Sequence, residues 1–205
     1  LITAIGAWVL EQACAQAARW SMDHPEAAAF SISVNLSARQ LLLPSLVDDV
    51  VDVLRRTGLP ANRLTLEITE TVLMEDVDFS IERLLGLKEL GVRLAVDDFG
   101  TGYSSLSYLK QLPIDTLKVD RSFVDGLGTD PHDSSIVAAV VALAEALGLV
   151  ALAEGVETRL HVAELRSLGC QFAQGYHYAR PLGADELSAC FGQVLPLPRP
   201  IVTEP

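Results

Sequence analysis

The stretch Val92-Arg-Leu-Ala-Val-Asp97, which runs directly into Asp98-Phe-Gly100, carries the pattern that decides the fold. It is short and rich in aliphatic residues, which is typical of a β-strand. Alternate side chains of a strand point to opposite faces, so Leu94 and Val96 share one face and Asp97 lies on the other. The stretch therefore predicts a strand that buries one face and ends in acidic residues.

Stretches of this kind recur along the chain and alternate with helical patterns. Strand-like stretches are roughly 30–36, 64–69, 92–97, 114–120, 149–154 and 170–175. Helix-like stretches are roughly 2–22, 38–57, 76–90, 104–111, 133–147, 158–168 and 184–192. Strict alternation predicts a parallel sheet with crossover helices. The six visible units fit an open doubly wound sheet, or a closed eight-stranded barrel with two further strands upstream of Leu1.

The faces of the strands favour the barrel. In 30–36, 64–69 and 116–120, apolar residues lie on one face and small or polar residues on the other, which would line a barrel interior. The strands that end at Glu154 and Gln174 fit less cleanly, because these residues share a face with apolar neighbours. We therefore expect an α/β fold, a TIM-like (β/α)8 barrel, incomplete at its N-terminus, over residues 1–194. A proline-rich tail, 195–205, should be extended or disordered.

Composition and charge restrict the class of protein. Half of the 205 residues are hydrophobic and 20% are charged, so the chain can bury a core. The net charge of −12, without a run of Lys or Arg, argues against a long nucleic-acid partner. No apolar run is long enough to span a membrane, and the three cysteines form no CxxC motif. We expect a cytoplasmic domain without membrane contact of its own, although its parent could be anchored.

Polar or charged side chains with possible chemical roles end all six predicted strands: Asn35, Glu67, Asp97, Asp98, Lys118, Asp120, Glu154 and Gln174. A single acid in such a place is more often a helix cap or a turn residue. The helices have other candidate caps, however. Ser37 with Gln40 resembles a capping box, and Thr158 precedes a helical stretch. Ser104 or Ser105 could cap the helix after Asp98. We therefore interpret the set as one site at the carboxyl mouth of the barrel.

Several acids in one site require cations. Two carboxylates about 4 Å apart repel by roughly 4 kcal/mol at an effective dielectric of 20. Oxygen ligands with a lysine favour Mg²⁺ or Mn²⁺, and the absence of histidine from the strand ends disfavours zinc. Asp97 next to Asp98 could serve two ions, with one carboxylate bridging them. Two ions roughly 3.5–4 Å apart are the usual arrangement for in-line hydrolysis of a phosphodiester.

The motifs at these positions resemble, in order and context, those of the EAL family. They are Ser33-Val-Asn-Leu-Ser37, Leu66-Glu-Ile-Thr-Glu70, Asp97-Asp-Phe-Gly-Thr-Gly-Tyr-Ser-Ser105, Lys118-Val-Asp120, Glu154-Gly-Val-Glu157 and Gln174-Gly-Tyr176. The resemblance extends from Leu1 to Leu182, and its Asp97–Ser105 stretch is highly specific. It implies a modified eight-stranded barrel that hydrolyses cyclic di-GMP to linear pGpG with Mg²⁺ or Mn²⁺.

The resemblance also implies roles for the matching residues. Asn35, Glu67 and Asp97 are similar to the ligands of one metal ion. Asp97 would bridge to a second ion, which Asp98 also binds. The loop after Asp98 is linked in the family to dimer formation, so the resemblance implies a homodimer. It also implies a sensory or GGDEF-type domain upstream in the parent protein.

Other matched positions concern the reaction itself. Lys118 is similar to the residue that holds the attacking water and offsets charge in the transition state. Glu154 is similar to an acid that positions metal or water, and whether it or a metal-bound hydroxide is the base stays open. Gln174 and Asp120 would line the substrate-binding site. Glu70 is similar to the anchor of the glycine-containing loop after Asp98, a role that a fixed carboxylate can fill by accepting hydrogen bonds.

One departure from the family concerns its naming Glu-Ala-Leu. That motif lies on a strand upstream of the helix that begins here at Leu1, so its metal-ligating Glu and an arginine contact to the ligand are missing. The sequence Glu145-Ala-Leu147 occurs late in a helical stretch, and we interpret it as coincidence. Loss of even an outer ligand costs about 10–100-fold in metal affinity or activity, so this chain could be impaired.

Three hypotheses for the function follow. The first is a two-metal phosphodiesterase that acts on cyclic di-GMP. The second is a receptor that binds cyclic di-GMP without cutting it. The third, which does not depend on the resemblance, is an Mg²⁺-dependent barrel enzyme of the enolase kind, in which a lysine abstracts a proton.

Overall fold

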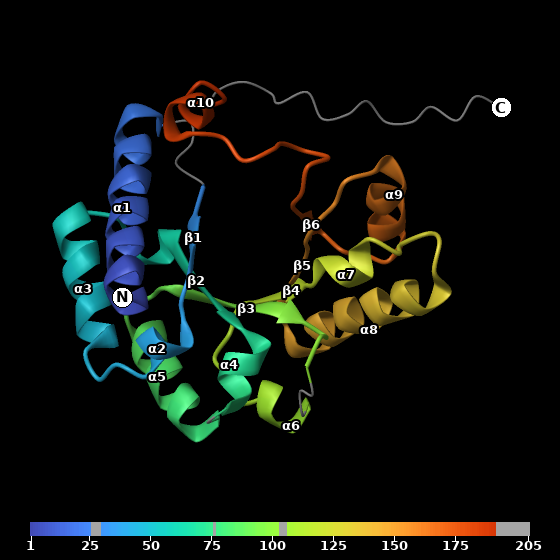
Figure 1. The fold of residues 1–205 in the computed structure, drawn as a ribbon, viewed down its shortest axis with the longest axis horizontal. Helices are drawn as coiled ribbons and strands as arrows, with labels where there is room; N and C mark the ends of the chain where they lie inside the picture. Colours follow the sequence, from blue (N-terminus) through green and yellow to red (C-terminus); the bar gives the residue numbers. More distant parts are fainter. Residues whose placement is uncertain (26–29, 76, 103–105, 192–205) are drawn as a thin grey trace.

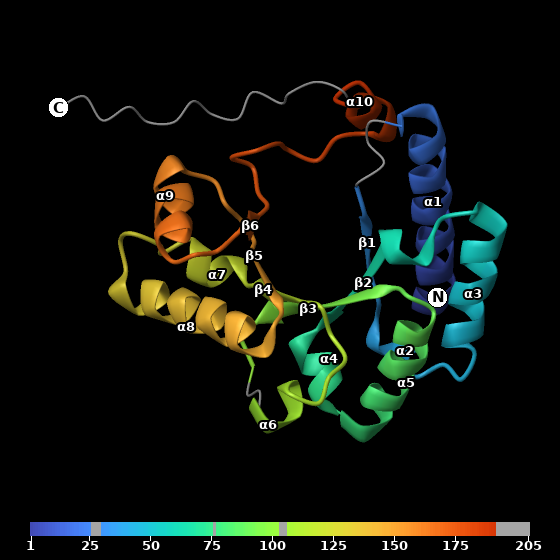
Figure 2. The same cartoon turned by 180° about the vertical axis from the view of Figure 1, so that it is seen from behind.

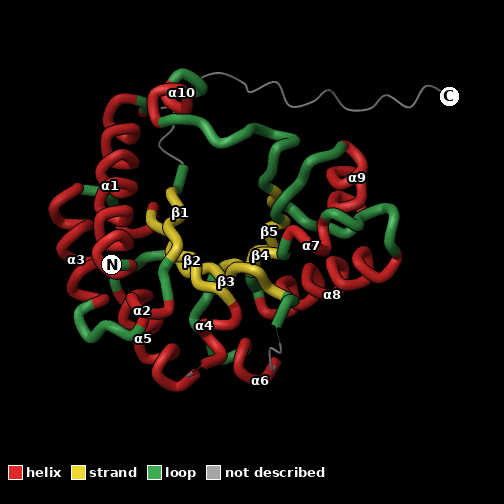
Figure 3. The backbone as a smooth tube through the Cα atoms, in the orientation of Figure 1, coloured by secondary structure: helices red, strands yellow, loops and turns green. Residues whose placement is uncertain are grey.

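The strands form one parallel sheet that curls into an arc. The computed structural model describes residues 1–25, 30–75, 77–102 and 106–191. The strands are β1 (Ile32–Asn35), β2 (Leu64–Thr69), β3 (Arg93–Phe99), β4 (Thr116–Val119), β5 (Val150–Ala153) and β6 (Phe172–Ala173). Each pairs in parallel with the next, in the order β1-β2-β3-β4-β5-β6. Figure 3 shows the arc with helices on its outer side, so the prediction of an α/β barrel with six visible units is confirmed as a partial barrel.

The helices lie outside the arc, on both flanks (Figures 1 and 2). They are α1 (Ile2–Asp23), α2 (Ala38–Leu41), α3 (Leu46–Thr57), α4 (Glu70–Glu75), α5 (Val77–Glu89), α6 (Leu106–Leu109), α7 (Arg121–Val124), α8 (Pro131–Leu147), α9 (Arg159–Ser167) and α10 (Ala184–Ser188), with a 3₁₀ turn, η2 (Ala61–Arg63). None of the helices in the described part of the chain combines the length and the apolar character needed to cross a bilayer.

Some predicted boundaries were wrong, for local reasons. The single helix expected over 38–57 is divided into α2 and α3, because Pro44 disfavours helical backbone at the residue before it and cannot itself donate a helical hydrogen bond. The short helices α4 and α7 were not expected. Residues 103–105 and 192–205, which include the candidate caps Ser104 and Ser105 and the proline-rich tail, lie outside the described residues.

The predicted caps and strand faces agree with the structure elsewhere. The amide oxygen of Gln40 accepts hydrogen bonds from the backbone N–H and the hydroxyl of Ser37, at 3.2 and 2.7 Å. The Thr158 hydroxyl accepts from the His161 N–H at 3.1 Å. Apolar residues on the outer face of the central strands are fully buried under the helices: Leu64, Leu66, Ile68, Leu94, Val96, Leu117 and Val119. The concave face is left for the polar set.

The segment after β6 returns across the open side of the arc to α1 (Figure 1). Its end is held by aromatic contacts. The Trp20 indole N–H donates to the Ser188 hydroxyl at 2.7 Å, and the Phe191 ring lies 5.7 Å from Trp20 and 5.6 Å from Phe30 between centroids. These contacts join the two ends of the sheet, β1 and β6, through α1 and α10.

Candidate metal and catalytic site

The register of the sheet brings the polar strand ends together. Asn35 lies opposite Glu67 in the β1–β2 pair, and Asp97 lies opposite Thr69, two positions further along β2. Lys118 is in β4, and Glu154 directly follows β5, where its backbone N–H donates to the Val119 carbonyl at 3.1 Å. Side chains from β2, β3, β4 and the end of β5 therefore meet at one mouth of the arc, with Asn35 of β1 in register beside Glu67.

Lys118 is at the centre of this cluster. Its Nζ lies 2.5 Å from Glu67 Oε2, 2.6 Å from Glu154 Oε1 and 2.9 Å from Asp97 Oδ1. The side chain of Lys118 is 4% exposed, and those of its three acidic partners are 11–17% exposed. One ammonium group thus faces three carboxylates, which leaves two negative charges without a partner among these four side chains.

Burial and charge act in opposite directions on these groups. Burial disfavours the ammonium of Lys118, but hydrogen bonds to Glu154, Glu67 and Asp97 outweigh it and hold the Lys118 pKa above its ordinary value. Burial is also the main reason that the pKa of Glu154 is raised, and repulsion from Asp97 and Glu67 adds to it, while Lys118 opposes it. The local charge balance therefore favours further cations.

A backbone irregularity places two consecutive acids in the site. Successive residues of a regular strand face opposite sides, so Asp97 and Asp98 should diverge. Asp98 instead has a φ of 54°, in the left-handed region, and the β3–β4 register shifts between Val96 and Phe99. As a result Asp97, Asp98 and Glu154 each offer a carboxylate oxygen within 4.8 Å of the other two. The strand predicted to end at Asp97 continues to Phe99 through this bulge.

These three oxygens fit a divalent cation such as Mg²⁺ or Mn²⁺. All the donors are oxygen atoms, and their negative charge exceeds what Lys118 can neutralise. The group includes Glu154, for which we expected a catalytic role, whereas Glu67 adjoins it through Lys118.

Asp120 has two sets of contacts. It caps α7, where its Oδ1 accepts from the Ser122 N–H at 2.9 Å and from the Ser122 hydroxyl. Our expectation that the strand-end acids are not needed as caps was therefore wrong for Asp120. It also shares a hydrogen bond with Asp98; burial, repulsion from Asp97 and this contact raise the Asp98 pKa. Burial raises the Asp120 pKa, but the hydrogen bonds, chiefly those from Ser122, outweigh it and lower that pKa overall.

Gln174 and Glu70 support the cluster from two sides. The Gln174 amide donates to Glu154 Oε1 at 2.6 Å, so this residue orients the carboxylate. Glu70, which begins α4, is 1% exposed, and its Oε2 accepts from the Gly100 N–H at 2.8 Å. A Cβ added at Gly102 would lie 2.6 Å from Glu70 Oε1. The backbone after Asp98 thus lies directly against the buried Glu70 carboxylate, in the contact expected for an anchor.

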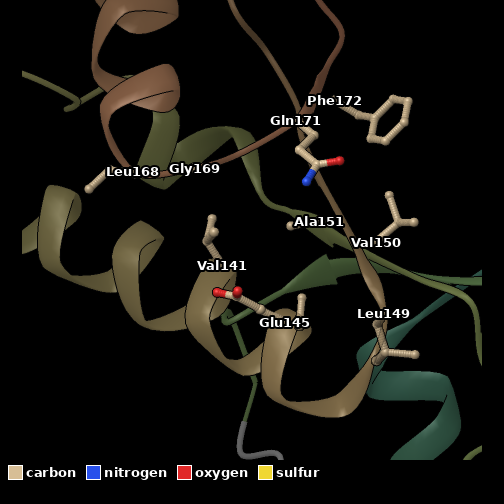
Figure 4. Close-up of a pocket in the computed structure, with 10 residues that line it drawn as sticks. Val141, Glu145, Leu149, Val150, Ala151, Leu168, Gly169, Gln171 and Phe172 are labelled. Carbon is tan, nitrogen blue, oxygen red and sulfur yellow. The ribbon is translucent and has the colours of Figure 1, made fainter.

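The sequence Glu145-Ala-Leu147 lies elsewhere. It forms the end of α8, and Glu145 lines a pocket of about 370 Å³ near the start of β5, together with Leu149 and Phe172. Figure 4 shows this pocket between α8 and the first residues of β5 and β6. Glu154 follows the opposite end of β5, so Glu145 is not part of the cluster around Lys118.

Some residues beside the site were missed in the sequence. A second pocket of about 410 Å³ adjoins Glu154 and is lined by Arg121 and Arg180, among others. The Arg121 guanidinium pairs with Glu157 at 2.8 Å, and that of Arg180 lies 4.9 Å from the Tyr176 ring centroid. Neither arginine belongs to a local sequence pattern that indicates contacts with residues so far along the chain.

Comparisons with known proteins agree with this geometry. The family profile described as EAL domain matches residues 1–181. The chain is 47% identical over 189 residues to the bifunctional diguanylate cyclase/cyclic di-GMP phosphodiesterase MucR of Pseudomonas aeruginosa, covering 92% of this chain and 27% of that protein. The chain spans about a quarter of the length of such curated relatives.

Solved structures of EAL proteins resemble this chain in both fold and sequence. The MucR phosphodiesterase in complex with c-di-GMP superposes with a TM-score of 0.88 at 46% identity, over 91% of this chain and 75% of that one. A manganese/cy-diGMP complex of Klebsiella pneumoniae BlrP1 has a TM-score of 0.79 at 32% identity, over 87% of this chain and 45% of that one.

Proposed function

Because the chain belongs to the EAL domain family, we propose that it hydrolyses cyclic di-GMP to linear pGpG at the cluster around Lys118. The single observation that carries this proposal is the convergence of Glu67, Asp97 and Glu154 on one buried ammonium group. The structures of MucR with c-di-GMP and of BlrP1 with manganese and cy-diGMP support the ligand and the cation.

Two Mg²⁺ or Mn²⁺ ions, when bound, would polarise the phosphate and lower the pKa of an attacking water. Asn35, Glu67 and Asp97 would hold one ion, and Asp97 and Asp98 the other. This assignment is supported by the oxygen-only donor set and by the left-handed backbone that places Asp97 and Asp98 in the same site.

The residues of the chain contribute charge and orientation. Hydrolysis adds water across one P–O bond, and negative charge grows on the phosphoryl oxygens as water attacks and the 3′ oxygen leaves. Lys118, held protonated by its three partners, would stabilise that charge from a fixed position. Glu154, whose pKa is raised and whose Oε1 accepts a hydrogen bond from Gln174, would orient the attacking water and is a candidate to accept its proton.

To test this proposal, the chain is incubated with cyclic di-GMP and Mg²⁺ or Mn²⁺. The products are separated by chromatography and identified by mass spectrometry. We expect pGpG from the wild type, and at least about a 100-fold loss of rate in Glu67→Gln and Asp97→Asn, because each removes a charged ligand. Asp52→Asn, which changes an exposed acid on α3 that pairs with Arg55, is the matched control and should keep full activity. Unchanged turnover in Asp97→Asn would refute the assignment.

A second candidate function is binding without cleavage. The structure of MucR in complex with c-di-GMP supports the ligand for this function as well. Calorimetric titration with cyclic di-GMP, followed by analysis of the recovered ligand, separates the two functions. Recovery of intact ligand after saturating binding would support the receptor function. Absence of binding would favour the enolase-like enzyme instead.

We also propose that the parent protein has an upstream sensory or GGDEF-type domain and forms a homodimer through the loop after Asp98. The first point is supported by the relative MucR, which is a bifunctional diguanylate cyclase/cyclic di-GMP phosphodiesterase. Analytical ultracentrifugation of the parent, with and without substitutions at Gly100 and Gly102, tests the second. A dimer that is unaffected by such changes would argue against this loop as the interface.

A further inference from the structure

We propose that Lys118 sets the affinity of the site for divalent cations, because its ammonium group occupies the same carboxylates that would hold them. This inference deepens the proposed function and depends on it. Lys118 is then a positioning residue for the cation site as well as a source of charge for the reaction.

The first argument is geometric. Lys118 Nζ lies within 2.5–2.9 Å of oxygens from Glu67, Asp97 and Glu154. Asp97 and Glu154 are also two of the three residues whose oxygens come within 4.8 Å of one another. A cation bound to those oxygens and the ammonium group therefore compete for the same lone pairs.

The second argument is electrostatic. The acids of the cluster are at most 17% exposed, so bulk water screens them poorly. In the absence of divalent ions, Lys118 is the one cation of the described residues that forms a salt bridge with Glu67, Asp97 or Glu154. It therefore lowers the free energy of the metal-free state and repels an entering cation. Both effects weaken metal binding.

The experiment measures Mn²⁺ binding to the whole chain, by the loss of the electron paramagnetic resonance signal of free Mn²⁺. Lys118→Met keeps the length of the side chain and removes its charge. We expect it to bind Mn²⁺ at least about tenfold more tightly than the wild type, which corresponds to about 1.4 kcal/mol. Lys88→Met is the matched control, because Lys88 also forms a salt bridge, to Asp115 at 2.7 Å, but outside the cluster. Its Mn²⁺ affinity should equal that of the wild type.

The outcomes separate the two proposals. If the wild type binds no Mn²⁺, the proposed metal-dependent function fails. If it binds Mn²⁺ and Lys118→Met binds it no more tightly, only the inference about Lys118 is overturned. If Lys118→Met is unfolded without metal, its thermal unfolding is measured at increasing Mn²⁺ concentrations in place of the binding titration. Recovery of a cooperative transition then supports the inference, since the ion restores the lost charge, and failure to recover at saturating Mn²⁺ refutes it.

Discussion

Glu70 offers a direct test of how the loop after Asp98 is held. Its carboxylate is 1% exposed and accepts the Gly100 N–H at 2.8 Å. Glu70→Ala removes a hydrogen bond to a charged acceptor, which contributes about 1.5–3 kcal/mol, and leaves a cavity. For a domain of this size, each kcal/mol lowers the melting temperature by about 2–4 °C, so we expect a fall of roughly 3–12 °C.

The assays are thermal denaturation and turnover of cyclic di-GMP. Glu70→Ala should lose both stability and activity, because the backbone that follows Asp98 is no longer fixed. Glu70→Gln keeps an oxygen that can accept from Gly100, and it should retain more of each. Glu82→Ala, an exposed acid on α5, is the control and should change stability by less than about 0.5 kcal/mol. If Glu70→Ala matches this control in stability and turnover, the anchoring role is wrong.

Two further predictions concern metal and thiols. Mn²⁺ at 100 times its dissociation constant should stabilise the fold by about 2.7 kcal/mol, a rise of roughly 5–10 °C in melting temperature that EDTA reverses and Glu67→Gln abolishes. Equal melting with and without Mn²⁺ would contradict this. Burial raises the pKa of the Cys14 thiol from 9.0 to about 11, so its contribution to stability falls as the pH rises through that window. At pH 8 the half-buried Cys190 should react with a thiol reagent before Cys14 does, and simultaneous labelling, followed by mass spectrometry, would show that the buried thiol is accessible.

Much of the site could be predicted because strand geometry is local. The two-residue period of a strand was enough to place Glu67, Asp97 and Lys118 on the concave face. It also accounts for the less regular strand β5. In β5 the fully buried Ala153 faces the helices, whereas Val150 is 41% exposed on the face that Glu154 shares, toward the open side of the arc.

Other features depend on contacts between distant parts of the chain. The bulge at Asp98 breaks the period from which strand faces are predicted, and nothing in the adjacent residues requires a left-handed backbone there. The cap made by Asp120 was overlooked because α7 is too short to show a helical period. The pairing of Arg121 with Glu157 joins residues from two strand–helix units, which a local pattern cannot indicate.

The left-handed backbone at Asp98 places a carboxylate in the site at a cost to the stability of the fold. A side chain in that conformation costs on the order of 1 kcal/mol, and the raised pKa of Asp98 records a further penalty for its charge. Asp98→Gly should therefore raise the free energy of unfolding measured by chemical denaturation, and it should abolish the proposed turnover of cyclic di-GMP. At residue 98, loss of a carboxylate from the site would therefore raise stability rather than lower it.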